Sequence, residues 1–187
     1  ASAPFAITEE PLPKLVAWTE DVAQVASVKA YNRIGLWLHP EDLVVEQGEL
    51  AGLKVQAVNA SWPADISARA GWSEKVSVWT QAALRDGAMR AGNHFGAEVS
   101  SGETSDLSTS LTEWSKQNEL QAVVAYRPFV GPWLAEALAL ESVLAAAGIA
   151  MIWRRRDWDT EYFPHATRGY FPFWERIKSA GNDGDNV

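Results

Sequence analysis

The sequence has no cysteine among its 187 residues, which excludes disulfides, thiolate nucleophiles and cysteine-ligated zinc or iron–sulfur centres. Its three histidines, His39, His94 and His165, have no metal-ligand spacing, so we expect no metal site. No apolar run is long enough to span a membrane, and the first residues lack the basic and apolar regions of a signal peptide. We therefore expect a cytoplasmic protein with no membrane partner.

The short signatures of common ligands and reactions are also missing. The sequence contains no G-x-G-x-x-G, Walker A, H-E-x-x-H or G-x-S-x-G pattern, and its strand ends lack the paired aspartates of a phosphatase. A formal net charge of -8 argues against nonspecific binding of nucleic acid or anionic membrane by the whole surface. We expect no catalytic residue, and function has to be inferred from the fold and the residues at the strand ends.

The composition is that of a globular protein, with 47% hydrophobic and 21% charged residues. A chain of this length accommodates one well-buried domain and a short appended segment. Ten tryptophans are many for this length, and we expect most of their area to be buried against a core or a partner.

Residues 120–157 have the pattern of a strand, a turn, a helix and a second strand. The apolar run 122–126 predicts a buried strand, which Pro128 and the Gly131-Pro132 pair end. Residues 133–147 contain neither proline nor glycine and carry an apolar stripe, and Gly148 separates them from a further apolar run at 149–153. Such a unit is the building block of an open parallel sheet.

The rest of the chain continues the alternation of strands and helices. We expect helices at 12–31, 74–95, capped by Ser73 and ended by Gly96, and 105–117, strands at 33–38, 54–59 and 97–101, and a loop at 60–63. Gly87 and Gly92 inside the long helix suggest close packing against a strand. The predicted fold is α/β: a doubly wound, mostly parallel sheet of about five strands with helices on both faces.

The carboxyl ends of the strands predict the ligand site, because open parallel sheets bind ligands in the crevice beyond those ends. The helix that begins after Pro132 would direct its free N–H groups toward an anion there. The candidate ligand-binding residues are His39, Trp62, Arg127, Gly131, Trp133 and Arg154.

Three consecutive arginines, Arg154 to Arg156, directly follow the last apolar strand. They are interpreted either as a clamp for an anion, because guanidinium groups pair bidentately with carboxylate or phosphate, or as a solvated strand end. Asp157, Asp159 and Glu161 follow closely and would pair with them in a local salt-bridge network. The histidines are expected to have structural or solvent-exposed roles more often than ligand roles.

The segment 158–180 is rich in aromatic residues, interrupted by two prolines and a glycine that we expect to prevent a long helix. Such an aromatic surface has to be covered, so we expect this segment to pack on the α/β domain at 12–157. Stacking of its aromatic residues on nucleic-acid bases is a weaker alternative. Residues 1–11 are interpreted as a linker and residues 181–187 as a disordered tail.

Three segments resemble photolyase/cryptochrome-related flavoproteins. WDTEYFPHATRGYFPFWERI (158–177) is similar to a segment of the form WD...WPHAT(K/R)GFF.F...I, WTQAALRDGAMRAGNHFG (79–96) to the long helix of that group, and VVAYRPFVGPWLAEALALESVLAAAGI (123–149) to its proline-and-glycine turn and following helix. The order of strands also resembles the α/β antenna domain of photolyases. The resemblance covers about residues 33–178.

The resemblance implies a noncatalytic α/β domain, a partner of a helical flavin domain that binds FAD and contacts DNA in a DNA-repair or light-sensing parent protein, itself a photolyase-like lyase. It also implies a pigment- or nucleotide-like ligand, such as a folate or a deazaflavin. In this group the α/β unit lies after the flavin domain, so residues 1–11 would be the interdomain linker. Two alternatives remain: an independent small-molecule or nucleotide-binding α/β enzyme, and a protein interaction module.

Overall fold

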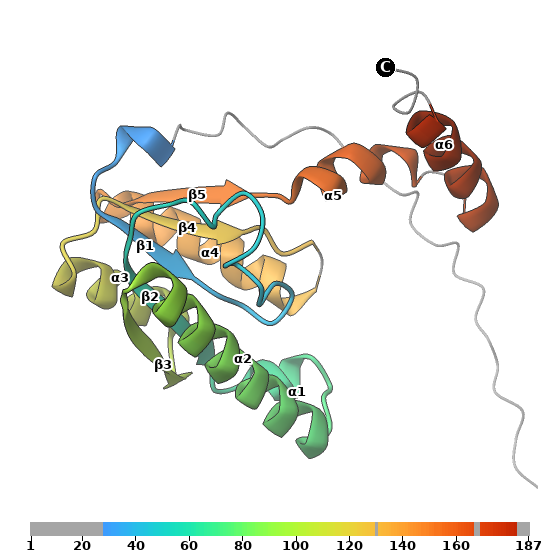
Figure 1. Cartoon of the computed structure of the whole chain (residues 1–187). Coiled ribbons are helices and arrows are strands. Elements are labelled where there is room, and N and C mark those ends of the chain that lie inside the picture. Colours follow the sequence, from blue (N-terminus) through green and yellow to red (C-terminus); the bar gives the residue numbers. More distant parts are fainter. Residues whose placement is uncertain (1–27, 130, 167–168, 183–187) are drawn as a thin grey trace, which may run out of the picture. The chain divides into compact units, whose positions relative to one another are not determined.

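The computed structural model describes residues 28–129, 131–166 and 169–182, and divides the chain into two units (Figure 1). The larger unit comprises residues 24–159, and the smaller unit includes residues 160–187. The strands are β1 (Ile34–Trp37), β2 (Val55–Pro63), β3 (Glu98–Thr104), β4 (Ala122–Tyr126) and β5 (Ala150–Arg154). The helices are η1 (Val28–Ala30), α1 (Ile66–Arg69), α2 (Glu74–Phe95), α3 (Leu107–Gln117), α4 (Pro132–Ala146), α5 (Asp157–Tyr162), η2 (Phe163–His165) and α6 (Tyr170–Asn182).

The five strands form one parallel sheet in the order β3-β2-β1-β4-β5, which confirms the predicted doubly wound α/β fold. Helix α2 packs on β2 and β3. Helices α3 and α4 pack on each other and, respectively, on β2 and β5. Figure 1 shows α2 in front of the sheet and α4 behind it, so both faces are covered.

Burial falls from the centre of the sheet to its β3 edge, as the sequence pattern requires. Every residue of the central strands β1 and β4 is buried, because both strands are covered on both faces and are continuous apolar runs. The edge strand β3 is mostly exposed and consists largely of polar residues. The apolar core therefore lies around β1 and β4.

Helix α2 has the ends that the sequence predicts. Ser73 accepts a hydrogen bond from the Val76 amide at its start, and Gly96 ends it with a left-handed φ of 63°. Inside the helix, a Cβ at Gly92 would collide with Val99 of β3, so close packing against a strand is confirmed there. Gly87 instead faces Leu43, in the connection between β1 and β2, so its neighbour is a loop and not the predicted strand.

Two strands are longer than predicted. The segment 60–63, expected to be a loop, forms the last part of β2, and β3 continues past residue 101 to Thr104. The two extensions pair with each other, Ala60 with Ser101 through Pro63 with Thr104. A prediction from the alternation of apolar and polar side chains misses such an extension, because backbone hydrogen bonds between the two strands stabilise it more than the identity of the side chains does.

The connection between β1 and β2, residues 38–54, contains no helix in the described structure, although a crossover helix is usual there. Val45 and Leu50 are each 1% exposed and supply the apolar layer that a helix would provide. Polar contacts tie the connection to α2: Arg90 bonds to Glu46 and to the Leu43 carbonyl, and His94 bonds to the Ala51 carbonyl.

In the smaller unit, the expectation that prolines and a glycine prevent a long helix holds at Pro164 and Gly169, which lie between α5 and α6, but is wrong for Pro172. Helix α6 extends from Tyr170 to Asn182 and accommodates Pro172 in its first turn, where the missing amide hydrogen has no intrahelical partner to lose. Gly181 and Asn182, expected in a disordered tail, belong to this helix. The Tyr170 and Trp174 rings stack one turn apart with centroids 6.3 Å apart.

The linker predicted at 1–11 and most of the helix predicted at 12–31 lie outside the described residues, as do residues 183–187. Residues 28–30, at the end of that predicted helix, form the 3-10 helix η1. The packing of residues 158–180 on the α/β domain stays a prediction.

Candidate functional site

A small cavity lies at the carboxyl ends of β1, β4 and β5. It lies at the topological switch point, because β2 and β3 extend the sheet from one side of β1, whereas β4 and β5 extend it from the other. We call it the arginine cavity. Its lining residues are His39, Glu41, Asp42, Tyr126, Arg127, Phe129, Arg154, Arg155, Arg156 and Asp159.

The register of β4 and β5 brings two arginines side by side. Tyr126 pairs with Arg154, and the amide of Arg127 donates a hydrogen bond to the Arg154 carbonyl over 2.9 Å. The residues that follow on each strand, Arg127 and Arg155, are therefore neighbours across the strand ends. The position of the arginines follows from strand length and register, both of which the sequence pattern predicts.

His39 follows β1 and is 1% exposed. Its Nε2 lies 2.7 Å from the Tyr126 carbonyl oxygen, so Nε2 carries the proton, and Nδ1 accepts from the Glu41 amide over 3.3 Å. Burial lowers the pKa of His39 to about 4, which keeps the ring neutral near pH 7. With both nitrogens bound to backbone, His39 links the ends of β1 and β4 and does not act as a base.

Arg156 is used internally and not on a ligand. Its guanidinium makes a bidentate pair with Asp42, at 2.6 and 2.8 Å, and donates to the Val44 carbonyl over 3.0 Å. It also lies over the Tyr126 ring, 4.5 Å from the centroid. The salt-bridge interpretation of the arginine run thus holds for Arg156, whose bidentate carboxylate partner, Asp42, lies in the β1–β2 connection.

Tyr126, which lines the cavity, is bonded to Glu49 of the β1–β2 connection. The Tyr126 hydroxyl donates to Glu49 over 2.7 Å, and the other Glu49 oxygen accepts from the Asp157 amide over 2.8 Å. Burial, and then the bond to Glu49, raise the pKa of Tyr126, so the phenol stays protonated. These contacts fix the connection 38–54 against the ends of β4 and β5.

The electrostatic character of the cavity is cationic. Its lining contains four arginines and three carboxylates, and the Arg156–Asp42 pair neutralises one of each. Burial, followed by the positive charge of Arg127, lowers the pKa of Arg155, so the two guanidinium groups repel each other. Burial raises the pKa of both Glu41 and Asp159, which reduces the negative charge at the site as the pH falls.

The six predicted site residues fall into different places. His39, Arg127 and Arg154 line the arginine cavity. Trp62 and Trp133 line a second small cavity. Gly131 is the N-cap of α4, with φ 76°, and lines neither of these two cavities. The structure thus brings the charged members together and the aromatic members together, but not all six.

Sequence reasoning missed Glu41, Asp42 and Asp159 as lining residues. Glu41 lies shortly after the end of β1, and its carboxylate accepts a hydrogen bond from the Phe129 amide over 3.1 Å. The rule that assigned His39 to the crevice, proximity to a strand end, would have found Glu41 and Asp42 as well. The pairing of Asp42 with Arg156 carries no local signal, because the two residues are far apart in the sequence.

Within residues 28–129, 131–166 and 169–182, no group of three or more histidine or acidic side chains is arranged to hold a metal ion. The same residues include no helix whose length and hydropathy would allow it to cross a bilayer.

Comparison with protein-family models and with curated protein sequences gave no match to this chain.

Proposed function

We propose that the α/β unit is a noncatalytic binding module that takes an anionic group, a phosphate or a carboxylate, in the arginine cavity. The observation that carries this proposal is the juxtaposition of Arg127 and Arg155 at the switch point. A bound anion would reduce the repulsion between the two guanidinium groups, which Asp159 offsets in part at Arg155. Arg154 lines the same cavity and adds a third guanidinium.

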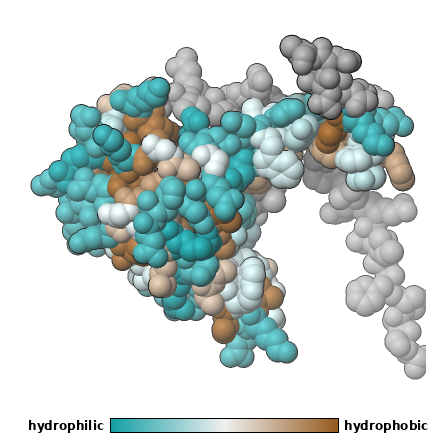
Figure 2. Space-filling model, viewed as in Figure 1, coloured by the Kyte–Doolittle hydropathy of each residue, from teal (hydrophilic) through white to brown (hydrophobic). Residues whose placement is uncertain are grey.

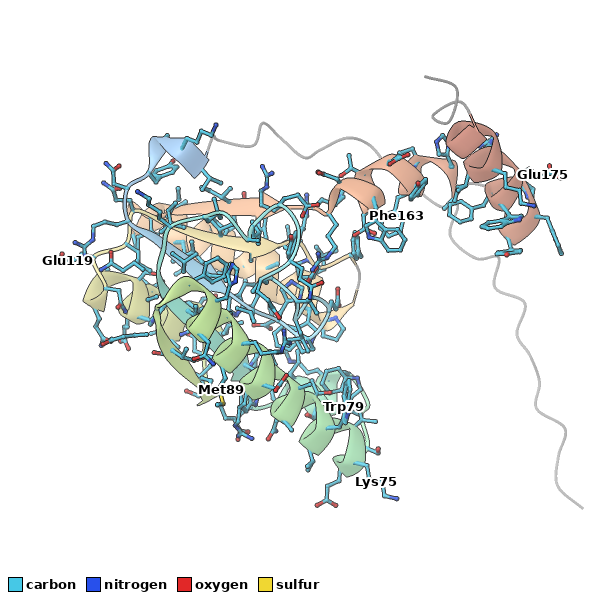
Figure 3. The ribbon with its side chains drawn as sticks, in the orientation of Figure 1. Lys75, Trp79, Met89, Glu119, Phe163 and Glu175 are labelled. Atoms are coloured by element: carbon cyan, nitrogen blue, oxygen red, sulfur yellow. The ribbon has the colours of Figure 1, made fainter. Side chains whose placement is uncertain are left out.

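The experiment is a calorimetric titration of the whole chain with inorganic phosphate, pyrophosphate and AMP at constant ionic strength. Replacing Arg127 or Arg154 with Ala should weaken binding at least tenfold, about 1.4 kcal/mol, because a hydrogen bond to a charged group is worth roughly 1.5 to 3 kcal/mol. Lys75→Ala is the control: it removes the same charge from an exposed position on α2 (Figure 3). If Lys75→Ala weakened binding equally, the effect would come from the net charge of the chain and not from the arginine cavity, and the proposal would be contradicted.

The family resemblance supplies the setting of this module. We propose that the chain is the α/β domain of a photolyase/cryptochrome-like flavoprotein, in which a separate helical domain holds FAD and contacts DNA. The support is the three similar segments together with the order of strands and helices. The isolated chain should then bind no stoichiometric flavin and repair no pyrimidine dimers under light. Flavin absorbance in the purified chain, or light-dependent repair by it, would contradict the proposal.

A second candidate function, a small-molecule enzyme, is favoured by one observation. Glu41 borders the arginine cavity, and partial burial raises the pKa of its carboxyl group, as is common for a general acid. Glu41→Gln distinguishes the two functions, because it would abolish turnover but leave phosphate binding intact or slightly stronger. Turnover of a phosphate or carboxylate ester by the wild type, absent in Glu41→Gln, would favour the enzyme.

A further inference from the structure

Strand β3 forms one edge of the parallel sheet, and none of the described strands pairs with its outer side (Figure 1). Five of its seven residues are exposed. It pairs with β2 in an unbroken register, from Ala57 with Glu98 to Pro63 with Thr104. The strand contains no proline, lysine or bulge, which are devices that commonly prevent an edge strand from pairing with another chain.

Alternate residues of β3 direct their backbone groups away from β2. The amide of Ala64 donates a hydrogen bond to the Thr104 carbonyl over 2.8 Å, so the backbone groups of Thr104 point toward β2. Successive residues of a strand point their N–H and C=O groups to opposite sides. Val99, Ser101 and Glu103 therefore direct these groups outward, and the edge carries a regular row of donors and acceptors.

This row is complementary to a copy of itself. In an antiparallel pair with a twofold axis at Ser101, Val99 of one copy lies opposite Glu103 of the other, and Ser101 lies opposite Ser101. Both residues of each pair point their backbone groups outward, so each pair would exchange two hydrogen bonds. An axis at Ser101 thus uses every outward-pointing residue of the strand.

The charges of β3 also permit pairing with a second copy. The strand has two acids, Glu98 and Glu103, and no base. With the axis at Ser101, the residues opposite them are Thr104 and Val99, so no two carboxylates meet directly across the interface. This self-complementarity favours a second copy of the chain over an unrelated extended peptide.

Helix α2 adds apolar side chains beside the same edge. Gly92 packs against Val99 of β3, and Met89, three residues earlier, lies on the same flank of the helix (Figure 3). Val99 is 40% exposed and Met89 is 63% exposed. Pairing of two β3 strands would bring these side chains of both copies to one face of the joined sheet, where they would lose contact with water.

We propose that β3 is a homodimer interface, in which two copies of the chain pair antiparallel about a twofold axis at Ser101 and join their sheets into one. A single strand is a small contact compared with the roughly 800 Å² that each partner buries in a standard interface. Dimerisation therefore depends on protein concentration. The formal net charge of -8 on each copy opposes it, so added salt should strengthen it.

Crosslinking tests the register directly. The chain has no cysteine, so Ser101→Cys introduces a single thiol, whose Cα would lie about 5.5 Å from that of its copy, within disulfide reach. We expect copper phenanthroline to convert most of the whole chain into a disulfide-linked dimer. Ser100→Cys is the matched control: its copy would lie two residues along the strand, roughly 8 Å away, so crosslinking should be at least tenfold slower. Equal rates for the two exposed positions would indicate random collision and overturn the proposal.

Sedimentation equilibrium measures the association without a thiol. We expect Ser101→Lys to weaken the dimer at least tenfold, because two ammonium groups would meet at the axis, whereas Ser100→Lys changes the net charge equally without that contact. A wild-type chain that stays monomeric at about 1 mM would overturn the proposal. So would a larger loss in Ser100→Lys than in Ser101→Lys.

Hydrogen–deuterium exchange of the wild type decides the question even if a variant does not fold. The amides of Val99, Ser101 and Glu103 should gain protection as the protein concentration rises, whereas that of Ser100, which points toward β2, should be protected at every concentration. Protection of the outward amides that does not depend on concentration would show that a segment of the same chain covers the edge. That result would overturn the homodimer.

Discussion

Large aromatic side chains are buried in the α/β unit and exposed in helix α6. Trp37, Trp62 and Trp133 are at most 2% exposed, whereas Tyr170 and Phe171 are 63% and 76% exposed. In the α/β unit these three tryptophans lie on β1, β2 and α4, and the rings of Trp37 and Trp133 have centroids 6.3 Å apart; in α6 the aromatic residues lie within two turns of one helix. Composition alone therefore does not determine burial; the spacing of aromatic residues along elements that meet does.

Some hydrophobic side chains of the α/β unit are also exposed (Figure 2). Hydrophobic residues interrupt the hydrophilic surface where α1 and the first turns of α2 lie, and Val78 and Trp79 there are 60% and 70% exposed. Leu84 of the same helix is 1% exposed, so α2 divides its large hydrophobic residues between core and surface.

The largest expected effect tests whether the α6 aromatic residues are covered. Ending the chain after Asp157 removes seven large aromatic side chains, each of which would bury on the order of 150 to 250 Å² if covered. Even half of that area at about 25 cal/mol per Å² gives several kcal/mol, comparable to the net stability of a domain. We expect the truncated chain to be insoluble or molten in circular dichroism and size-exclusion experiments. A monomeric truncated chain with an unchanged melting temperature would instead show residues 158–180 to be a docking arm, as in the interaction-module alternative.

The next effect sharpens the difference between the two kinds of tryptophan. Trp37→Ala should lower the free energy of unfolding by about 3 to 5 kcal/mol, because it leaves a cavity between β1 and the rings of Trp133 and Trp153. Trp174→Ala, at a position 43% exposed, should lower it by less than about 1 kcal/mol. Urea denaturation of both variants measures the two values. Equal losses would place both tryptophans in one core.

A smaller effect, on pH dependence, follows from the ring that contacts Trp37 and Trp133. The folded state holds the pKa of His39 at about 4, below the usual value of 6.5, so the unfolded chain binds a proton that the folded chain does not. The contribution of His39 to stability is complete above pH 6.5 and is lost as the pH falls toward 4, by roughly 3 kcal/mol. His39→Gln keeps a donor to the Tyr126 carbonyl and cannot titrate, so its stability should fall less over that interval. If the free energy of unfolding fell equally with pH in the wild type and in His39→Gln, the result would contradict a buried neutral His39.

The smallest expected effect concerns ion pairs. Asp42→Asn should destabilise the α/β unit by about 2 kcal/mol, because the Arg156 side chain is only 23% exposed and loses a bidentate partner. Asp65→Asn is the control: the Asp65–Arg69 pair is at the surface, and its loss should cost less than about 0.5 kcal/mol. Thermal unfolding of both variants provides the measurement, and similar losses would show that burial does not strengthen the Asp42–Arg156 pair.

Much of the fold could be predicted from the sequence because its signals are local. The apolar run 122–126, the Ser73 cap and Gly96 each specify an element or its end through nearby residues. The extension of β2 to Pro63 and the helix α6 could not be predicted in this way. The first depends on pairing with β3, and the second tolerates a proline only because of its position in the first turn.

The sequence predicts where the candidate site lies, but not which of its residues line the same cavity. Strand ends identified His39, Arg127 and Arg154, which line one cavity. Assigning Trp62 to a different cavity required the packing of α2 against the end of β2, which depends on contacts between distant residues. For the same reason the function of Arg156 was left open, since its partner Asp42 follows another strand.

The connection 38–54 gives the arginine cavity a wall whose dynamics differ from those of the sheet. Most of its backbone amides are outside the ladders of β1 and β4, and side chains such as Arg90, Tyr126 and Arg156 anchor it at a few points. Hydrogen–deuterium exchange should therefore report opening of this connection at a lower free energy than opening of the central strands. Such an opening would leave intact the strands that position Arg127 and Arg155.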